Sequence, residues 1–258
     1  MGDSCLKSIQ VGTGAVGRKI AVSWRAGAAP GLLWLGGFKS DMNGIKARAL
    51  DEFARDRGRA MVRFDYSGHG ASDGAFTDGT IGRWLEESQA VFDAFCRGPQ
   101  VLVGSSMGGW LALLLVRDLL RLKVVLHATV AGLVLIAPAA DFTEELMWKR
   151  MPPEIRDEIE RNGVWARPSA YSQEPYPITR GLIEEGRNHL LLGGMIETGC
   201  PVRILQGVMD EDVPWQHAVE LSARFARDDV VLTLVKDGDH RLSRPQDIER
   251  MIAAVAEF

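Results

Sequence analysis

Two hydrophobic patterns alternate along most of this chain. Short apolar runs are typical of buried strands, and longer segments with apolar residues at helical spacing are typical of amphipathic helices. The strand-like runs are 19–24, 31–35, 59–65, 100–103, 130–138, 202–207 and 230–235. The helix-like segments are 43–57, 80–96, 110–120, 215–226 and 244–258. Strands that alternate with helices predict an α/β fold with a mostly parallel sheet.

The alternation stops between residues 140 and 199. Helix-like pieces at 142–150, 153–161 and 178–192 take over, and a loop rich in proline and aromatic residues, 165–176, separates the last two. This predicts core residues 1–139, a helical cap of residues 140–199 inserted after the sixth strand, and core residues 200–258. Candidates for an acyl pocket in the cap are Met147, Trp148, Met151, Trp165, Tyr171 and Tyr176. The alternative is that these side chains only attach the cap to the body.

A possible nucleophile lies between the run that ends at Val103 and the helix-like segment 110–120. Gly104-x-Ser106-x-Gly108 is the nucleophile elbow motif in its strand–turn–helix context. So sharp a turn strains the serine backbone, and side chains at the two glycine positions would collide across it. We predict that Ser106 is a catalytic nucleophile. The motif alone is also compatible with a glycine-rich turn that has no chemistry.

An acid and a base follow later strands. Asp210 and Asp212 come after the run 202–207, and His240 comes after the run 230–235. Because the ends of parallel strands meet at one edge of a sheet, these side chains can converge on Ser106. A serine hydroxyl needs an imidazole to take its proton, and a carboxylate must fix the imidazole tautomer. The order Ser, Asp, His is that of α/β-hydrolases.

Two further loops have candidate roles. Gly36-Gly37-Phe38 follows a central strand, and we expect the N–H groups of Phe38 and Met107 to form an oxyanion hole, with Gly37 beside the substrate. The alternative is an ordinary glycine turn. His69 lies in the glycine-rich loop 66–74. We expect it to shape the pocket rather than to act as the base, because the base follows the acid in this layout.

Composition excludes several functions. The 258 residues carry a net charge of −4 and show no basic stripe, so nucleic acid is a poor partner. Three cysteines without C-x-x-C spacing predict neither a disulfide framework nor a zinc site. Gly12-x-Gly14-x-x-Gly17 matches the dinucleotide fingerprint but lacks its strand–helix context. We therefore expect a glycine-rich hairpin there, and no cofactor or metal.

The N-terminus and the apolar stretches also bear on location. The first residues show neither a signal-peptide nor a transit-peptide pattern. The most apolar long stretch, 124–140, contains His127 and Pro138 and is short for a membrane span. We expect a cytoplasmic protein without stable membrane insertion.

Taken together, these motifs resemble the α/β-hydrolase superfamily over nearly the whole chain, and within it esterases that act on palmitoylated proteins and acyl glucuronides. The resemblance is carried by segments 42–44, 63–68, 104–110, 163–165, 213–215 and 239–241. It implies an eight-stranded α/β-hydrolase fold. It also selects Asp210 as the acid, because Gly207, Val213 and Pro214 complete the pattern G-x-x-D-x-x-V-P.

The activity implied by this resemblance is that of a cofactor-free serine hydrolase. Its substrates would be small acyl esters or thioesters, or acylated proteins. The alternatives are a carboxylesterase of small or xenobiotic esters, including acyl glucuronides, and a ligand-binding receptor on a hydrolase fold.

Overall fold

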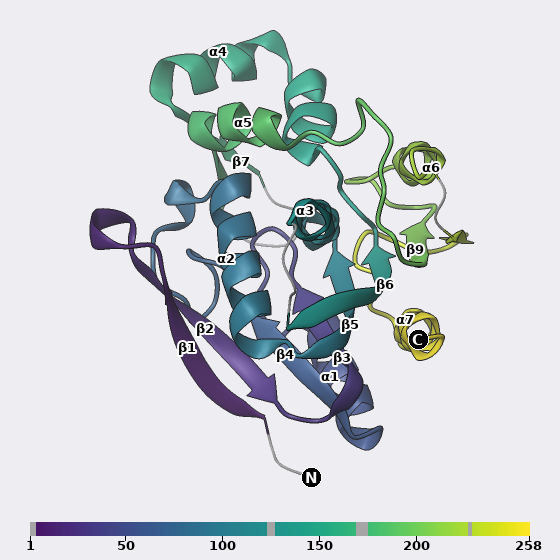
Figure 1. The fold of residues 1–258 in the computed structure, drawn as a ribbon. Coiled ribbons are helices and arrows are strands. Elements are labelled where there is room, and N and C mark those ends of the chain that lie inside the picture. The colour runs from purple at the N-terminus through teal and green to yellow at the C-terminus, as the bar shows by residue number, and fades with distance from the viewer. Residues whose placement is uncertain (1–3, 123–126, 169–174, 227–228) are drawn as a thin grey trace.

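The computed structural model describes residues 4–122, 127–168, 175–226 and 229–258 (Figure 1). An eight-stranded sheet runs through its centre in the order β1-β2-β4-β3-β5-β6-β9-β10. Strand β2 is antiparallel to both of its neighbours, and the pairings from β4 to β10 are parallel. The strands are β1 (Cys5–Val11), β2 (Arg18–Arg25), β3 (Ala28–Leu35), β4 (Arg59–Phe64), β5 (Gly98–Ser105), β6 (Ala128–Ile136), β9 (Val202–Gly207) and β10 (Val230–Val235). The predicted α/β-hydrolase fold is confirmed.

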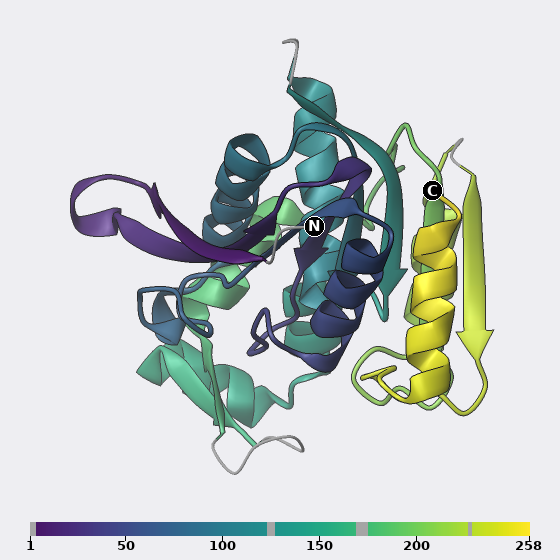
Figure 2. The same cartoon turned by 90° about the horizontal axis from the view of Figure 1, so that it is seen from below.

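Helices cover both faces of this sheet. They are α1 (Ile45–Asp56), α2 (Ile81–Phe95), α3 (Met107–Arg121), α6 (Trp215–Ala223) and α7 (Pro245–Ala256). Buried side chains of α1 and α7 pack on one face, and those of α2, α3 and α6 pack on the other. The central strands are therefore buried on both sides, as parallel strands usually are. Figure 2 shows the β1–β2 ribbon at one side of the molecule and β10 with α7 at the opposite side.

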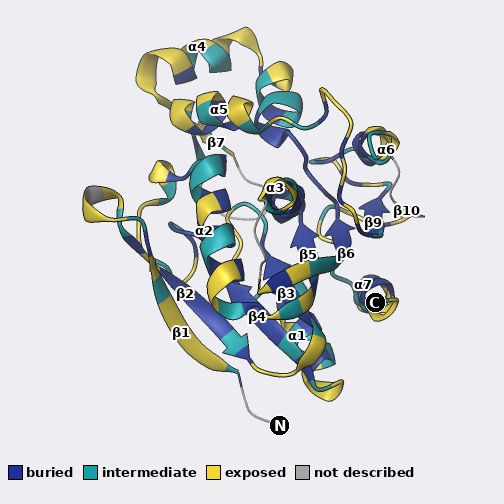
Figure 3. Cartoon of the chain, viewed as in Figure 1, coloured by how far each residue is buried: buried dark blue, intermediate teal, exposed yellow. Residues whose placement is uncertain are grey.

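The cap lies over the carboxyl ends of the strands. It contains α4 (Pro153–Asn162) and α5 (Arg180–Gly186), with short helical turns at Thr143–Met147, Trp148–Arg150 and Arg187–His189. Its outward surface is largely exposed, whereas the sheet beneath is buried (Figure 3). The limits 140 and 199 remain a prediction.

The cap also contains a small antiparallel sheet that the sequence pattern did not predict. Strands β7 (Val164–Arg167) and β8 (Tyr176–Thr179) pair with each other. The expectation of a plain loop at 165–176 is therefore wrong at 165–167 and at 176, whereas 169–174 lie outside the described residues. The expectation of a helix from residue 178 is also wrong. The helix begins only at Arg180 because the preceding residues pair with β7, and Thr179 Oγ1 accepts the N–H of Leu182 at its start.

Asp141 ties the start of the cap to its end. This buried carboxylate accepts hydrogen bonds from the backbone N–H groups of Leu191 and Leu192, at 2.8 to 3.0 Å. Burial raises its pKa, and the two amides lower it. Charged hydrogen bonds of this kind are stronger than neutral ones. The cap is thus held at both of its connections to the core.

The glycine-rich segment 12–17 joins β1 to β2. These two strands are antiparallel, with Val11 opposite Arg18. The expected hairpin is confirmed, and the strand–helix context of a dinucleotide site is absent from this segment. Within the described residues, no helix is long and apolar enough to cross a membrane.

Candidate active site

Ser106 occupies the sharp turn between β5 and α3. Its backbone angles are φ 55° and ψ −118°, a strained conformation for a residue other than glycine. The flanking glycines are required sterically. A Cβ at Gly104 would lie 2.4 Å from the carbonyl oxygen of Gly108, and one at Gly108 would lie 2.1 Å from that of Leu35. The predicted elbow geometry is therefore present, with the side chain of Ser106 projecting above the sheet edge.

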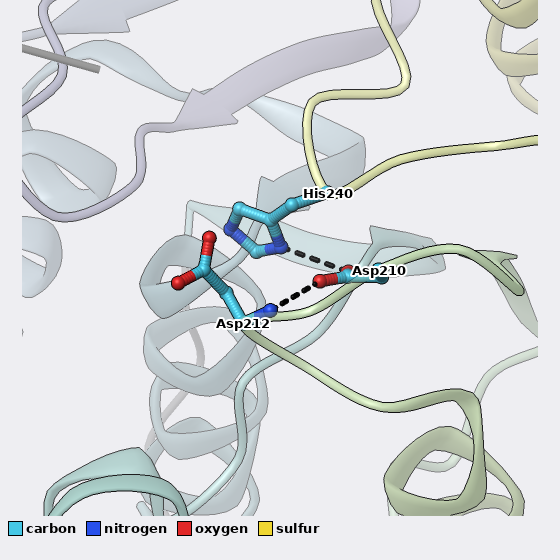
Figure 4. A group of neighbouring side chains, drawn as sticks. All are labelled: Asp210, Asp212 and His240. Atoms are coloured by element: carbon cyan, nitrogen blue, oxygen red, sulfur yellow. Dashed lines mark hydrogen bonds and ion pairs between the residues drawn. The ribbon is translucent and has the colours of Figure 1, made fainter. Parts of the chain in front are cut away.

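His240 lies between Ser106 and Asp210. Its Nε2 is 3.1 Å from Ser106 Oγ, and its Nδ1 is 2.8 Å from Asp210 Oδ2. Figure 4 shows the Asp210 carboxylate facing the imidazole ring. The three residues come from the ends of β5, β9 and β10, so the sheet topology brings them together. With Nδ1–H donating to Asp210, Nε2 is free of its proton and can accept that of the serine hydroxyl.

Asp210 is fixed by its own loop. Its Oδ1 accepts the N–H groups of Asp212 and Val213 at 3.0 and 2.8 Å, and its Oδ2 also accepts from Gln206 Nε2 at 3.0 Å. The side chain of Asp210 is fully buried. Four donors therefore surround this carboxylate, which orients it toward His240.

Asp212 contacts the cap. Its carboxylate forms an ion pair with Arg167 of β7 at 3.4 Å, and the start of α6 has no side-chain cap. The chain at 210–213 thus turns the side chain of Asp212 toward the cap. The backbone N–H groups of Asp212 and Val213 donate to the carboxylate of Asp210.

The loop after β3 lies against the nucleophile. A Cβ at Gly37 would be 3.4 Å from that of Ser106, which is an ordinary contact distance, so this loop packs directly beside the nucleophile. Edge-to-face contacts with Phe76, Trp84, Phe142 and Tyr176 hold the Phe38 ring. Met107 is the first residue of α3, where an N–H has no partner within the helix. Phe38 and Met107 thus line the same cavity as Ser106, and their role as oxyanion donors remains a prediction.

His69 lies behind this loop. Its Nε2 accepts the backbone N–H of Lys39 at 3.1 Å, and its Nδ1 is 3.1 Å from the carbonyl oxygen of Ser67. Burial lowers the pKa of His69 to about 4, so the ring is neutral at pH 7. It can then donate at one nitrogen and accept at the other. Lys39 has a φ of 61°, so His69 fixes a strained residue next to Phe38.

Two cavities open at Ser106 and His240. The cap cavity has a volume of about 390 Å³ and is lined by core and cap side chains including Phe142, Leu146, Met147, Tyr176 and Val213. The cationic cavity has a volume of about 380 Å³ and is lined by Gly37, Lys39, Ser40, Lys46, Arg241 and Ser243, among others. Phe38 and Tyr176 border both.

Four of the expected pocket residues, Met151 among them, do not line these cavities. Trp148 is sandwiched by the guanidinium groups of Arg156 and Arg187, at 5.5 and 5.2 Å from its ring. Trp165 packs against the core, and His69 lies behind the loop. Gly37 does line a cavity, and Tyr171 is outside the described residues. Phe142 and Leu146, which the sequence analysis did not select, do line the cap cavity. They are four residues apart, and this helical spacing of apolar side chains could have identified them.

Among the described residues, Asp210, Asp212 and His240 form the one group whose spacing suits a metal ion, with ligand atoms within 4.8 Å of one another. Both ring nitrogens of His240 and both oxygens of Asp210 already have partners within this site. A metal would have to displace these hydrogen bonds. The donor set therefore fits proton transfer better than metal binding.

Comparison with known proteins agrees with this geometry. The model of the alpha/beta hydrolase family matches residues 29–258. The chain belongs to this family. It is 40% identical to mouse "Palmitoyl-protein thioesterase ABHD10, mitochondrial" over 233 residues, 90% of this chain and 76% of that protein. This membership places the chain among the hydrolases.

Solved structures show the same relationship. An Agrobacterium vitis S4 crystal structure, described as that of a candidate hydrolase, is 51% identical, with a TM-score of 0.97 over 99% of both chains. Mouse alpha/beta hydrolase domain-containing protein 10 is 37% identical, with a TM-score of 0.84 over 97% of both chains. The expectation of a cytoplasmic location is contradicted by the curated relatives, whose names place them in mitochondria.

Proposed function

We propose that this chain is a serine hydrolase that cleaves acyl thioesters and carboxylic esters through a covalent acyl-enzyme on Ser106. The observation that carries the proposal is the continuous chain of contacts from Asp210 through His240 to Ser106, at 2.8 and 3.1 Å. This arrangement activates a hydroxyl that is otherwise a weak nucleophile at neutral pH.

In the first half-reaction, Ser106 Oγ attacks the acyl carbon and His240 Nε2 takes the hydroxyl proton. The N–H groups of Phe38 and Met107 stabilise the oxyanion. Removal of one such donor typically costs about 10²–10³ in kcat. The bond to the leaving group then breaks, and His240 returns its proton to that group. Asp210 keeps the imidazole in the tautomer this requires and stabilises the imidazolium that forms.

In the second half-reaction, a water molecule takes the place of the leaving group. His240 accepts a proton from this water as its oxygen attacks the acyl carbon, and then returns it to Ser106 as the free acid leaves. No cofactor is needed for either half-reaction.

The substrate class follows from the relatives and from the cap cavity. The curated relatives are named palmitoyl-protein thioesterases, and they share 38–40% identity over 90% of this chain. The cap cavity offers Phe142, Leu146 and Met147 to an acyl chain. We therefore infer that acyl groups with an aliphatic chain bind under the cap, and that acylated proteins and small acyl thioesters are both substrates.

Hydrolysis profiled against an acyl series from acetyl to palmitoyl, as thioester and as oxygen ester, tests this function. We expect steady turnover by the wild type, thioesters favoured over oxygen esters, and loss of turnover in Ser106→Ala. Preference for short oxygen esters would instead identify a carboxylesterase of small esters. Binding without turnover by folded wild-type protein would contradict the proposal and indicate a receptor.

A further inference from the structure

The two cavities at the nucleophile differ in chemistry. The cap cavity is lined by the apolar side chains of Phe142, Leu146 and Met147. Three charged residues, Arg167, Glu211 and Asp212, also line it. The cationic cavity is lined by Lys39, Lys46 and Arg241, and no carboxylate is among the described residues that line it. In a thioester or ester, the acyl chain and the leaving group extend from the carbonyl carbon in different directions. An aliphatic acyl chain suits the cap cavity, which leaves the cationic cavity for the leaving group.

We propose that the cationic cavity is the leaving-group site and that it selects thiol leaving groups that carry a phosphate group. This inference rests on the serine hydrolase function proposed above. In the step concerned, the bond from Ser106 Oγ to the acyl carbon forms and the carbon–sulfur bond breaks. The departing sulfur keeps the bonding electron pair and receives from His240 the proton that came from Ser106. The phosphate takes no part in bond breaking and only holds the thiol in place.

Lys46 is the central cation of this site. Its ammonium group donates one of its three N–H groups to the carbonyl oxygen of Arg241. This bond holds the ammonium group against the segment that follows His240. Burial, together with the positive charge of Arg241, lowers the pKa of Lys46, whereas the charges of Asp239, Asp247 and Asp210 raise it. The resulting pKa is about 8. Lys46 is therefore mostly charged at pH 7. A bound anion would favour that charge further.

The other donors come from two separate segments. Lys39 follows Phe38, and its ammonium group lies 5.0 Å from the Phe76 ring and 5.6 Å from the ring of Tyr176, which borders both cavities. Gly44 to Ala47, the start of the twelve-residue helix α1, also line the cavity. Initial N–H groups and the positive end of a helix favour phosphate. Several separate cations suit a dianion better than a single carboxylate.

The charge distribution also sets the orientation of such a substrate. The cap cavity is lined by Glu211, Asp212 and one cation, Arg167, which is already paired with Asp212, so a phosphate placed there would meet carboxylates. At the other side it meets Lys39, Lys46 and Arg241. A thioester with an aliphatic acyl group and a phosphorylated thiol therefore fits in one direction only, with its sulfur beside His240.

Matched substrates can test this inference. Hexanoyl pantetheine and hexanoyl 4′-phosphopantetheine differ only in the phosphate, and a second pair, the hexanoyl thioesters of 3-mercaptopropionamide and 3-mercaptopropionate, differs in a carboxylate. We expect kcat/KM to be roughly tenfold or more higher for the phosphate member of the first pair. This ratio should fall as salt is added, because partly exposed charges are screened. The carboxylate pair should show a ratio within about threefold of one, since a single negative charge makes fewer of these contacts.

Variants then assign the effect to the cavity. In Lys46→Gln and Lys39→Gln the phosphate ratio should fall toward one, and in Lys46→Glu it should fall below one. Lys7→Gln is the matched control, because Lys7 lies on the exposed edge strand β1 and stacks on Trp24. Its ratio should equal that of the wild type. Turnover of the neutral pantetheine thioester shows that each variant is folded.

The outcomes separate the two proposals. No hydrolysis of any thioester by the wild type would refute the hydrolase function itself. Steady hydrolysis of the neutral thioester with a phosphate ratio near one would refute only the leaving-group site. An equal preference for the carboxylate member of the second pair would overturn the assignment to phosphate.

Discussion

Replacement of Asp210 by asparagine should nearly abolish turnover. In the wild type, Oδ1 accepts two backbone N–H groups and Oδ2 faces His240 Nδ1 and Gln206 Nε2. An asparagine amide has only one oxygen. If that oxygen stays with the backbone donors, the NH₂ group faces Gln206 Nε2, itself a donor, and His240 Nδ1. His240 must then accept at Nδ1 and carry its proton on Nε2, where it can no longer accept the proton of Ser106.

The size of the effect follows from these contacts. A wrong histidine tautomer costs about 10⁴-fold in kcat in serine hydrolases. Gln206 Nε2 keeps its bonds to the carbonyl oxygens of Val213 and Gly207, so one N–H of the new amide would face it without an acceptor. This should also lower the free energy of unfolding by about 1–3 kcal/mol, since the side chain at position 210 is fully buried. The reverse amide orientation would place the NH₂ group against two backbone N–H groups, so it offers no escape. KM should change little because Asp210 does not line either cavity.

Asp212→Asn is the matched control. The side chain of Asp212 is about one-third exposed and pairs with Arg167, so the loss should be at most about 1 kcal/mol in stability. Its kcat should stay within about tenfold of the wild type, because Asp212 has no part in fixing the tautomer. Both variants are assayed on one activated ester after urea unfolding confirms that they fold. A large loss of kcat in Asp212→Asn with near-normal turnover by Asp210→Asn would refute this reasoning.

Two further predictions concern His69. Because His69 Nε2 accepts the Lys39 N–H, His69→Leu should lower kcat roughly ten- to hundredfold, less than the loss of a whole oxyanion donor. KM should be nearly unchanged, and His69→Gln, whose side-chain oxygen can accept that N–H, should restore most of the rate; equal losses in both variants would refute the positioning role. Burial lowers the pKa of His69 to about 4, so between pH 6.5 and pH 4 the unfolded chain binds a proton that the folded chain does not. Stability therefore falls as the pH falls, and from pH 7 to pH 5 the wild type should lose about 2 kcal/mol more than His69→Gln in urea unfolding. Equal losses would contradict a neutral buried histidine.

The sequence predicted those parts of the site that depend on short spacing or on sheet topology. The elbow around Ser106 needs glycines at fixed positions, and this requirement is visible in five residues. Asp210 and His240 are 104 and 134 positions away from Ser106. Their meeting could still be predicted, because parallel strands deliver their ends to one edge of the sheet.

Contacts between unrelated loops could not be predicted. The hydrogen bond from Lys39 to His69 joins two loops that carry no shared motif, so His69 was assigned only a general role in the pocket. The cationic cavity combines Lys39, Lys46 and Arg241, which lie in three separate segments. The strands β7 and β8 could not be predicted for another reason. Each has only four residues, and β8 contains Pro177, so the alternation is too short to distinguish from a loop.

Direct observation of the acyl-enzyme tests the central claim, covalent catalysis by Ser106. The wild type is mixed with hexanoyl pantetheine, quenched in acid during turnover, and analysed by intact mass and by fragmentation of the labelled peptide. The mechanism predicts one hexanoyl group per chain, located on Ser106, and none in Ser106→Ala. A hexanoyl group on Ser105 or on a cysteine, or one that persists in Ser106→Ala with turnover retained, would contradict it.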